Sequence, residues 1–199
     1  MILQDHDRLC EKAATLIAKK TVEGTTRYGK VFEVIYALNP LVETYGYILI
    51  SNDTYVKYKN TKELPPRFAV VNYEHTNYDG CESKLEFFLV ANNIKESHGL
   101  TAGTLENPFT CALECKFQDS SGSTEEKFNH TLHTLEHIEA GNAILLAEVD
   151  GMRACRFAWV AKAIDTRFYR VLAQEHVKDK RFKLFGTKQF DEWLLASHR

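Results

Sequence analysis

The stretch Phe109-Thr110-Cys111-Ala112-Leu113-Glu114-Cys115-Lys116-Phe117 decides the fold, because its residues alternate in character. Phe, Cys or Leu occupies every second position, and smaller or polar residues stand between them. Successive side chains of a β-strand point to opposite faces of a sheet, so this alternation predicts a strand with one buried face. We expect both cysteines of the stretch to point into the core.

A helix is predicted directly after this strand, at residues 124–140. Ser123 is followed three residues later by Glu126, the signature of a capping box, and Gly141 is a common C-terminal stop. This helix carries the three histidines at the centre of the chain, His130, His133 and His137. On a helical wheel they lie opposite the apolar stripe, which predicts that they face away from the core.

The rest of the chain predicts further strands and two more helices. Residues 7–20 and the segment after Thr187, a candidate cap, show apolar residues at helical spacing. Runs rich in Val, Ile, Phe and Tyr predict strands at residues 30–38, 45–51, 54–58, 68–75, 84–91, 143–149 and 153–161, the last two joined by Asp150-Gly151. The expected fold is α+β: a curved, mainly antiparallel sheet with an N-terminal helix, a central histidine-bearing helix and a C-terminal helix packed on one side or at its end, in a single domain of residues 1–199.

The composition is that of a globular protein, with 44% hydrophobic and 26% charged residues. No apolar run reaches the roughly 18 residues of a membrane span, and the acidic start is unlike a signal peptide, so we expect a cytoplasmic protein. The five cysteines are odd in number and form no C-x-x-C pair. They predict small buried side chains rather than disulfides or a structural zinc site.

One motif carries sharp chemistry: His133, Glu136 and His137 form an H-x-x-E-H sequence. Residues four apart on a helix are neighbours, so both imidazoles can bind one zinc or iron ion while Glu136 acts as a catalytic acid or base. His130 is a poor co-ligand, because seven residues of helix rise about 10 Å. Cys155 is the favoured third ligand, and Cys115 and His176 are the alternatives. The competing interpretation is a solvated helix face.

Residues 133–141, HTLEHIEAG, resemble the metal-binding helix H-T-L-E-H-[LI]-x-A-G of S-ribosylhomocysteinases. The resemblance implies that His133 and His137 bind a metal and that Glu136 is the general acid/base. That family uses a later cysteine as a ligand and a second cysteine, within Gly-Cys-Arg, as another acid/base; Ala154-Cys155-Arg156 is similar to this element only in part. The resemblance spans under a twentieth of the chain.

The C-terminal quarter is basic, with 11 Lys and Arg against 5 Asp and Glu in residues 151–199. Cations alternate with aromatic residues there, a composition that suits nucleic acid or another anion but is also typical of a half-buried strand. The candidate contacts are Arg167, Arg170, Lys180, Arg181 and Lys183.

Three functions therefore stay open: a metal-dependent hydrolase or lyase, a module that binds nucleic acid or another anion, and a non-catalytic interaction protein. The sequence shows no glycine-rich phosphate loop, no G-x-S-x-G elbow and no paired-carboxylate motif.

Overall fold

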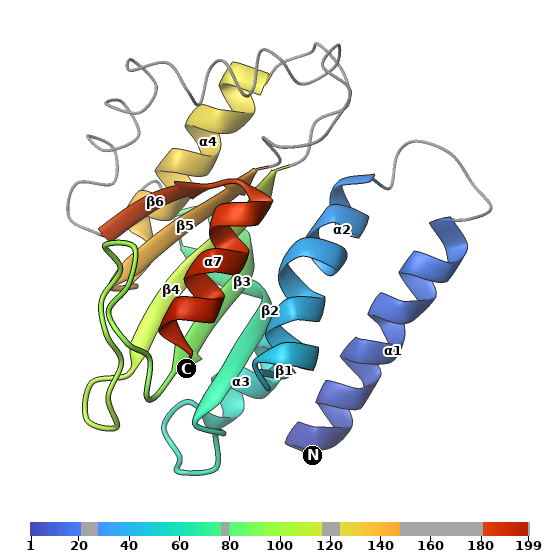
Figure 1. Cartoon of the computed structure of the whole chain (residues 1–199). Coiled ribbons are helices and arrows are strands. Elements are labelled where there is room, and N and C mark those ends of the chain that lie inside the picture. Colours follow the sequence, from blue (N-terminus) through green and yellow to red (C-terminus); the bar gives the residue numbers. More distant parts are fainter. Residues whose placement is uncertain (21–27, 77–79, 117–123, 148–180, 199) are drawn as a thin grey trace.

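The computed structural model describes residues 1–20, 28–76, 80–116, 124–147 and 181–198. They form a six-stranded sheet in the order β1-β2-β3-β4-β5-β6, with helices on both faces (Figure 1). The strands are β1 (Ile48–Ser51), β2 (Arg67–Thr76), β3 (Glu82–Ala91), β4 (Phe109–Lys116), β5 (Asn142–Ala147) and β6 (Arg181–Phe185). The helices are α1 (Ile2–Lys20), α2 (Tyr28–Glu33), the π-helical turns η1 (Val34–Leu38) and η2 (Pro40–Thr44), α3 (Asn52–Tyr58), α4 (Thr124–His137) and α7 (Thr187–Ser197).

The sheet is mixed. Its centre is the antiparallel meander of β2, β3 and β4, and both outer regions are parallel, at β1–β2 and at β4–β5–β6. Parallel neighbours need a crossover connection, and α4 lies in the connection between β4 and β5. The α+β class and the N-terminal, central and C-terminal helices are confirmed.

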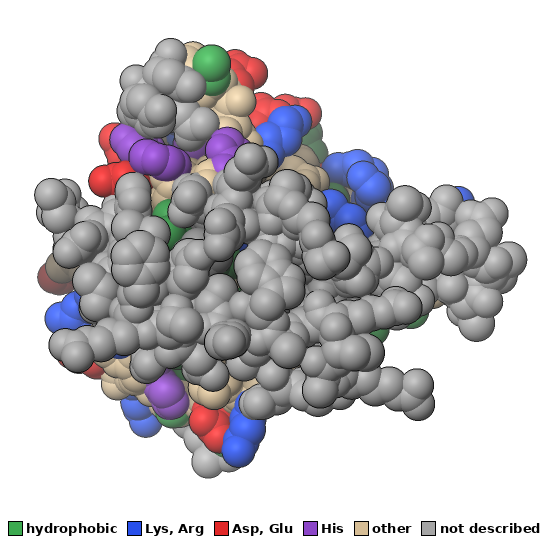
Figure 2. Space-filling model, turned by 90° about the horizontal axis from the view of Figure 1, so that it is seen from above, with side chains coloured by type: hydrophobic (Ala, Val, Ile, Leu, Met, Phe, Trp, Pro, Cys, Tyr) green, Lys and Arg blue, Asp and Glu red, His purple; other side chains and the backbone are tan. Residues whose placement is uncertain are grey.

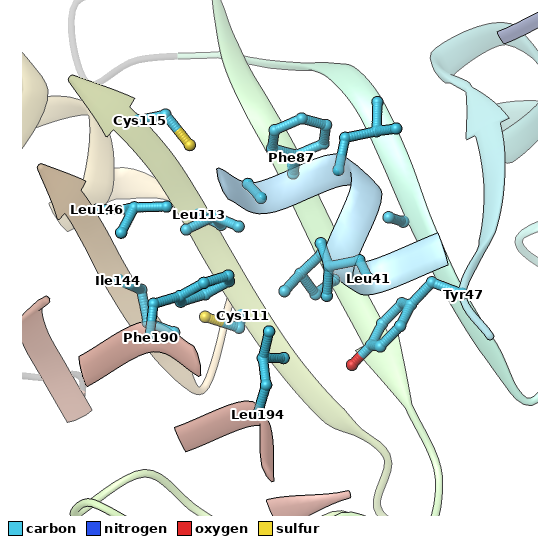
Figure 3. Close-up of a cluster of buried hydrophobic side chains, with 14 of the residues drawn as sticks. Leu41, Tyr47, Phe87, Cys111, Leu113, Cys115, Ile144, Leu146, Phe190 and Leu194 are labelled. Carbon is cyan, nitrogen blue, oxygen red and sulfur yellow. The ribbon is translucent and has the colours of Figure 1, made fainter. Parts of the chain in front are cut away.

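The helices cover both faces of the sheet, where we had expected them on one side or at the end. One buried cluster joins α1, α2, η1, η2 and α7 to the sheet, and Figure 3 shows part of it. A second cluster joins α4 to the opposite face and includes Leu132, Leu135 and Ile138. Two apolar layers explain why β4 and β5 are buried almost throughout.

The strand at residues 109–116 is confirmed. Cys111 and Cys115 are buried in the first cluster and point into it beside Leu113 (Figure 3), whereas Ala112 belongs to the second cluster. Not every cysteine follows this pattern, because Cys10 is half-buried and Cys81 is exposed.

Two predicted strands are helical instead. Residues 30–38 lie in α2 and η1, and residues 54–58 lie in α3. A short apolar run occurs in buried strands and in buried helices alike, so the Val, Ile, Phe and Tyr residues of these segments did not distinguish the two. The start of α3 was signalled by Ser51, whose hydroxyl accepts a hydrogen bond from the Thr54 backbone N–H at 3.3 Å.

The C-terminal helix begins at Thr187, but Gly186 is its N-cap, so Thr187 is not the capping residue. Helix α4 ends at His137, and Gly141 follows it in a loop where its N–H donates to the Thr110 hydroxyl at 2.9 Å. The predicted cap at Ser123, the turn at Asp150-Gly151 and the strand at residues 153–161 lie outside the described residues. Among the described residues, no helix is long and apolar enough to cross a membrane.

Candidate active site

Two glutamates lie close together on the neighbouring antiparallel strands β3 and β4. Phe87 of β3 pairs with Leu113 of β4, so the antiparallel register places Glu86 opposite Glu114, one step beyond that pair. Glu114 is 5% exposed, although acidic side chains are rarely buried unless they are paired. The strands therefore bring together two carboxyl groups that are 28 residues apart in the chain.

The backbone is irregular at this point of the sheet. Asn72 of β2, which lies opposite Glu86, adopts a left-handed φ of 53°. Residues two apart on a regular strand share a face, but Leu85 and Phe87 belong to the two different buried clusters. Glu86 thus sits where β3 exchanges its two faces, and Asn is one of the few residue types that tolerates the left-handed conformation.

Both carboxylates bond to backbone groups of the opposite strand. The Glu86 N–H donates to Glu114 Oε2 at 3.3 Å, and the Cys115 N–H donates to Glu86 Oε2 at 3.4 Å. These reciprocal bonds hold the two side chains against each other. Burial, together with a hydrogen bond to Glu114 and its negative charge, raises the pKa of Glu86.

Lys116 supplies a positive charge to this pair. Its ammonium group donates to Glu114 Oε1 and lies 3.5 Å from Glu86 Oε1. Glu114 and Lys116 are two residues apart on one strand, so they emerge on the same side of it. Burial disfavours the charged form of Lys116, but the carboxylates of Glu114 and Glu86 outweigh that effect and raise the pKa of Lys116.

A third glutamate approaches from helix α2, which contacts β4. Glu33 is 9% exposed and forms an ion pair with Lys30, whose Nζ lies 2.7 Å from Glu33 Oε2. Burial raises the pKa of Glu33 to about 7, although the charge of Lys30 opposes this shift. The charges of Glu86 and Lys116 also act on Glu33, so α2 contributes to the same electrostatic cluster. We call Glu33, Glu86, Glu114 and Lys116 the acidic site.

A cavity of about 460 Å³ opens beside the acidic site, between α1, α2 and the sheet. Glu33 and Glu86 form part of its wall, and the side chains of Leu16, Val34 and Phe87 form part of its apolar lining. Its cationic lining residues are Lys12, Lys19 and Lys30. Glu33 and Glu86 of the acidic site therefore border a concave surface, as expected for groups that contact a substrate.

The donor set of the acidic site fits a hard divalent cation such as Mg²⁺, which prefers carboxylate oxygens. Glu86 and Glu114 are the two carboxylates that the structure places together. Each raises the cost of charging the other, and a cation bound between them would favour the charged form of both. Glu33 is less close, because only His133, Glu136 and His137 among the described residues form a group of three donor atoms within 4.8 Å of one another. Glu33 thus adds negative charge to the site but is not one of its closest ligands.

Comparison with protein families places the chain in a nuclease superfamily. The chain belongs to the PD-(D/E)XK nuclease superfamily, whose domain model matches residues 66–194. The last three letters of that name describe an acidic residue, any residue and lysine, and Glu114-Cys115-Lys116 fits this pattern. Comparisons with curated proteins and with solved structures found no match.

The predicted histidine site forms a separate cluster. His133, Glu136 and His137 lie together on α4, on the face of the sheet opposite α2, and His130 is exposed, as the helical wheel predicted. Its proposed ligand Cys155 and the alternative His176 lie outside the described residues. The other alternative, Cys115, is wrong as a co-ligand, because it is buried in the cluster on the far face from α4.

Only two of the five predicted anion contacts lie within the described residues. Arg167, Arg170 and Lys180 lie outside the described residues. Arg181 forms an exposed ion pair with Glu96 at 2.9 Å, and Lys183 is half-buried on β6. Binding of nucleic acid through this segment stays a prediction, as do the likeness of α4 to S-ribosylhomocysteinases and the cytoplasmic location.

Sequence reasoning missed the acidic site, because its carboxylates meet only in the fold and no local motif pairs them. Each of its three glutamates stands alone in an apolar run: Glu33 within Val-Phe-Glu-Val-Ile, Glu86 within Leu-Glu-Phe-Phe-Leu and Glu114 within Ala-Leu-Glu-Cys-Lys-Phe. A charge within a predicted core segment is the signal that could have found them, because an unpaired buried carboxylate is costly.

Proposed function

We propose that this protein is a metal-dependent nuclease that hydrolyses phosphodiester bonds of nucleic acid at the acidic site. The observation that carries the proposal is the contact between Glu86, Glu114 and Lys116 inside a domain of the PD-(D/E)XK nuclease superfamily. Glu136 of the H-x-x-E-H motif is not the catalytic group in this proposal. The interpretation as a hydrolase is kept, but its centre moves from α4 to β3 and β4.

The protein's own residues prepare the site for a phosphate group. Glu86 and Glu114 would hold a divalent cation, which when bound neutralises phosphate charge and makes water more acidic. Lys116 is anchored by both glutamates, so its ammonium group is held in place and would stabilise negative charge on a phosphoryl oxygen bound beside it.

Glu33 and Lys30 form the second part of the site. Because the pKa of Glu33 is about 7, its carboxyl group can exchange a proton near neutral pH and can relay it to or from water at the cavity wall. The cationic side chains Lys12, Lys19 and Lys30 on the cavity wall favour entry of a polyanion over a neutral substrate.

The test is a cleavage assay on labelled single-stranded and double-stranded DNA and RNA, with Mg²⁺ or Mn²⁺ and with EDTA. We expect cleavage of at least one substrate that requires the metal. We expect Glu114→Gln to lower the rate by at least about 1,000-fold, since it removes a metal ligand and the anchor of Lys116. Glu96→Gln, an exposed glutamate paired with Arg181, is the matched control and should retain the wild-type rate. Equal rates for the two variants would exclude the acidic site as the catalytic centre.

A further inference from the structure

We propose that α4 carries a second metal site, in which His133, Glu136 and His137 bind one zinc ion independently of the acidic site. One donor atom from each of the three side chains lies within 4.8 Å of the other two. The donors of a tetrahedral zinc ion with bonds of about 2.0 Å lie about 3.3 Å apart, so small side-chain rotations suffice to close the site. We call these three residues the histidine site.

The distances within the histidine site are consistent with one shared ion. His133 Nδ1 lies 3.7 Å from Glu136 Oε2, and the imidazole rings of His133 and His137 are 6.3 Å apart at an angle of 28°. All three side chains are part-exposed, with 45% of the His133 side chain and 35% of the Glu136 side chain accessible to solvent. The face of the molecule in Figure 2 shows histidine side chains next to acidic ones. The three side chains therefore lie outside the buried core of the molecule.

A hydrogen bond to the helix backbone fixes the orientation of the His137 ring. His137 Nδ1 lies 2.8 Å from the backbone carbonyl oxygen of His133. A carbonyl oxygen only accepts, so Nδ1 of His137 is the donor in this hydrogen bond. Metal-binding histidines commonly donate their second nitrogen to a carbonyl or carboxylate in this way. Helix α4 thus orients His137 before the ion arrives.

The backbone under the histidine site is held firmly. Leu132, Leu135 and Ile138 alternate with the three donors along α4, and each is at most 2% exposed in the cluster on this face of the sheet. Packing of these residues fixes the rotation of the helix, so the donors keep a common direction.

The chemistry of the donors separates the two sites. Imidazole nitrogens suit zinc and similar transition metals, whereas the carboxylates of the acidic site suit Mg²⁺. Three protein donors leave one position of a tetrahedral zinc ion for water or a further ligand. The inference does not depend on the proposed nuclease activity, because it rests on residues of α4 alone.

The test measures zinc in the purified protein after dialysis against a competing chromophoric chelator. The starting protein is the double variant Glu86→Gln/Glu114→Gln, which removes the carboxylate pair of the acidic site and leaves α4 intact. We expect about one zinc ion per chain, with loss of that zinc when His133→Ala and His137→Ala are added. His130→Ala is the matched control, since it changes an exposed histidine of the same helix outside the cluster.

A second measurement separates loss of the ion from loss of the fold. Zinc should raise the Tm of the Glu86→Gln/Glu114→Gln protein by several degrees, because an ion that binds the folded state stabilises it. The single variant Glu136→Ala should bind zinc at least about 10-fold more weakly while its circular dichroism spectrum stays unchanged. Absence of zinc from the starting protein, or zinc that survives loss of both histidines, would overturn the inference.

Discussion

The acidic site and the histidine site differ in how the chain builds them. The histidine site comes from five consecutive residues of one helix, His133 to His137. The acidic site joins Glu33 of α2, Glu86 of β3 and Glu114 of β4, which are spread over about 80 residues and meet only when the sheet forms. A local site is thus visible in the sequence as a spacing, and a nonlocal one only as misplaced charges.

The two sites also differ in burial. Glu33 and Glu114 are nearly inaccessible, whereas His133 and Glu136 are part-exposed. Buried carboxylates that lie close together disfavour the charged state of Glu86, and the ammonium group of Lys116 offsets part of this cost. The histidine site has two imidazoles and only one carboxylate, so it does not bring two acidic groups together. We therefore expect substitutions in the acidic site to have large effects on activity and those in the histidine site to have small ones.

The largest difference in cleavage rate is expected between the variant Lys116→Met and the double variant His133→Ala/His137→Ala. Loss of one preoriented cation or donor commonly lowers a rate by about 100-fold to 1,000-fold. We expect an effect of that size for Lys116→Met in single-turnover cleavage. The double histidine variant should stay within about twofold of the wild-type rate, because α4 lies on the other face of the sheet from α2.

Lys84→Met is the matched control for Lys116→Met. Lys84 is an exposed lysine that pairs with Glu74 at 2.7 Å, so it has the same chemistry outside the site. Its variant should cleave at the wild-type rate. A loss of activity in the histidine variant as large as that in Lys116→Met would remove the distinction between the two sites.

The same contrast explains which parts of the fold could be predicted. Residues 109–116 and 124–137 form the strand and helix that alternation and helical spacing indicated. Residues 30–38 are helical and not the strand that we predict, because Val31, Phe32 and Val34 favour a strand when judged by residue type alone. Yet Val31, Val34, Leu38 and Leu41 recur at the spacing of a helix face, and all four are buried. The error hid Glu33, since a strand there would not place it beside Glu86.

Pairing between strands could not be predicted in the same way. Alternation shows which residues of β3 and β4 are buried but not which residues lie opposite each other. The contact of Glu86 with Glu114 depends on the register Phe87 to Leu113 and on the left-handed Asn72, and neither has a clear sequence signal. The connections that make the outer strands parallel likewise became clear only from the structure.

Leu135→Ala tests how firmly α4, the helix that carries the histidine site, is packed against the sheet. Leu135 lies between His133 and Glu136 in the sequence, and its side chain is fully buried against the sheet. Removal of a buried leucine side chain costs about 3 kcal/mol, so we expect a loss of that size in the free energy of unfolding, measured with urea. Leu195→Ala, at a 45% exposed position of α7, should cost less than about 1 kcal/mol. Equal costs would mean that α4 is not firmly packed.

His198 offers a third use of histidine and a test by pH. Burial, with the nearby charge of Arg67, lowers the pKa of His198 from 6.5 to about 4. The folded protein therefore binds this proton less readily than the unfolded chain does. The resulting stability is complete above pH 6.5 and is lost as the pH falls toward 4, by about 2 kcal/mol after allowance for partial exposure. Urea unfolding at pH 7 and pH 4.5 should show this loss, and His198→Leu should lack that part of it.

Tyr47→Phe gives the smallest expected effect and separates a structural histidine from a metal-binding one. His198 Nδ1 lies 3.0 Å from the Leu194 carbonyl oxygen, so it carries the proton, and the buried Tyr47 hydroxyl donates to Nε2 at 2.9 Å. Both nitrogens of His198 are thus engaged within the protein. Loss of the Tyr47 hydroxyl leaves Nε2 without that donor and should cost about 1 kcal/mol. The zinc content should stay unchanged; a fall in zinc on Tyr47→Phe would place the ion at His198 rather than on α4.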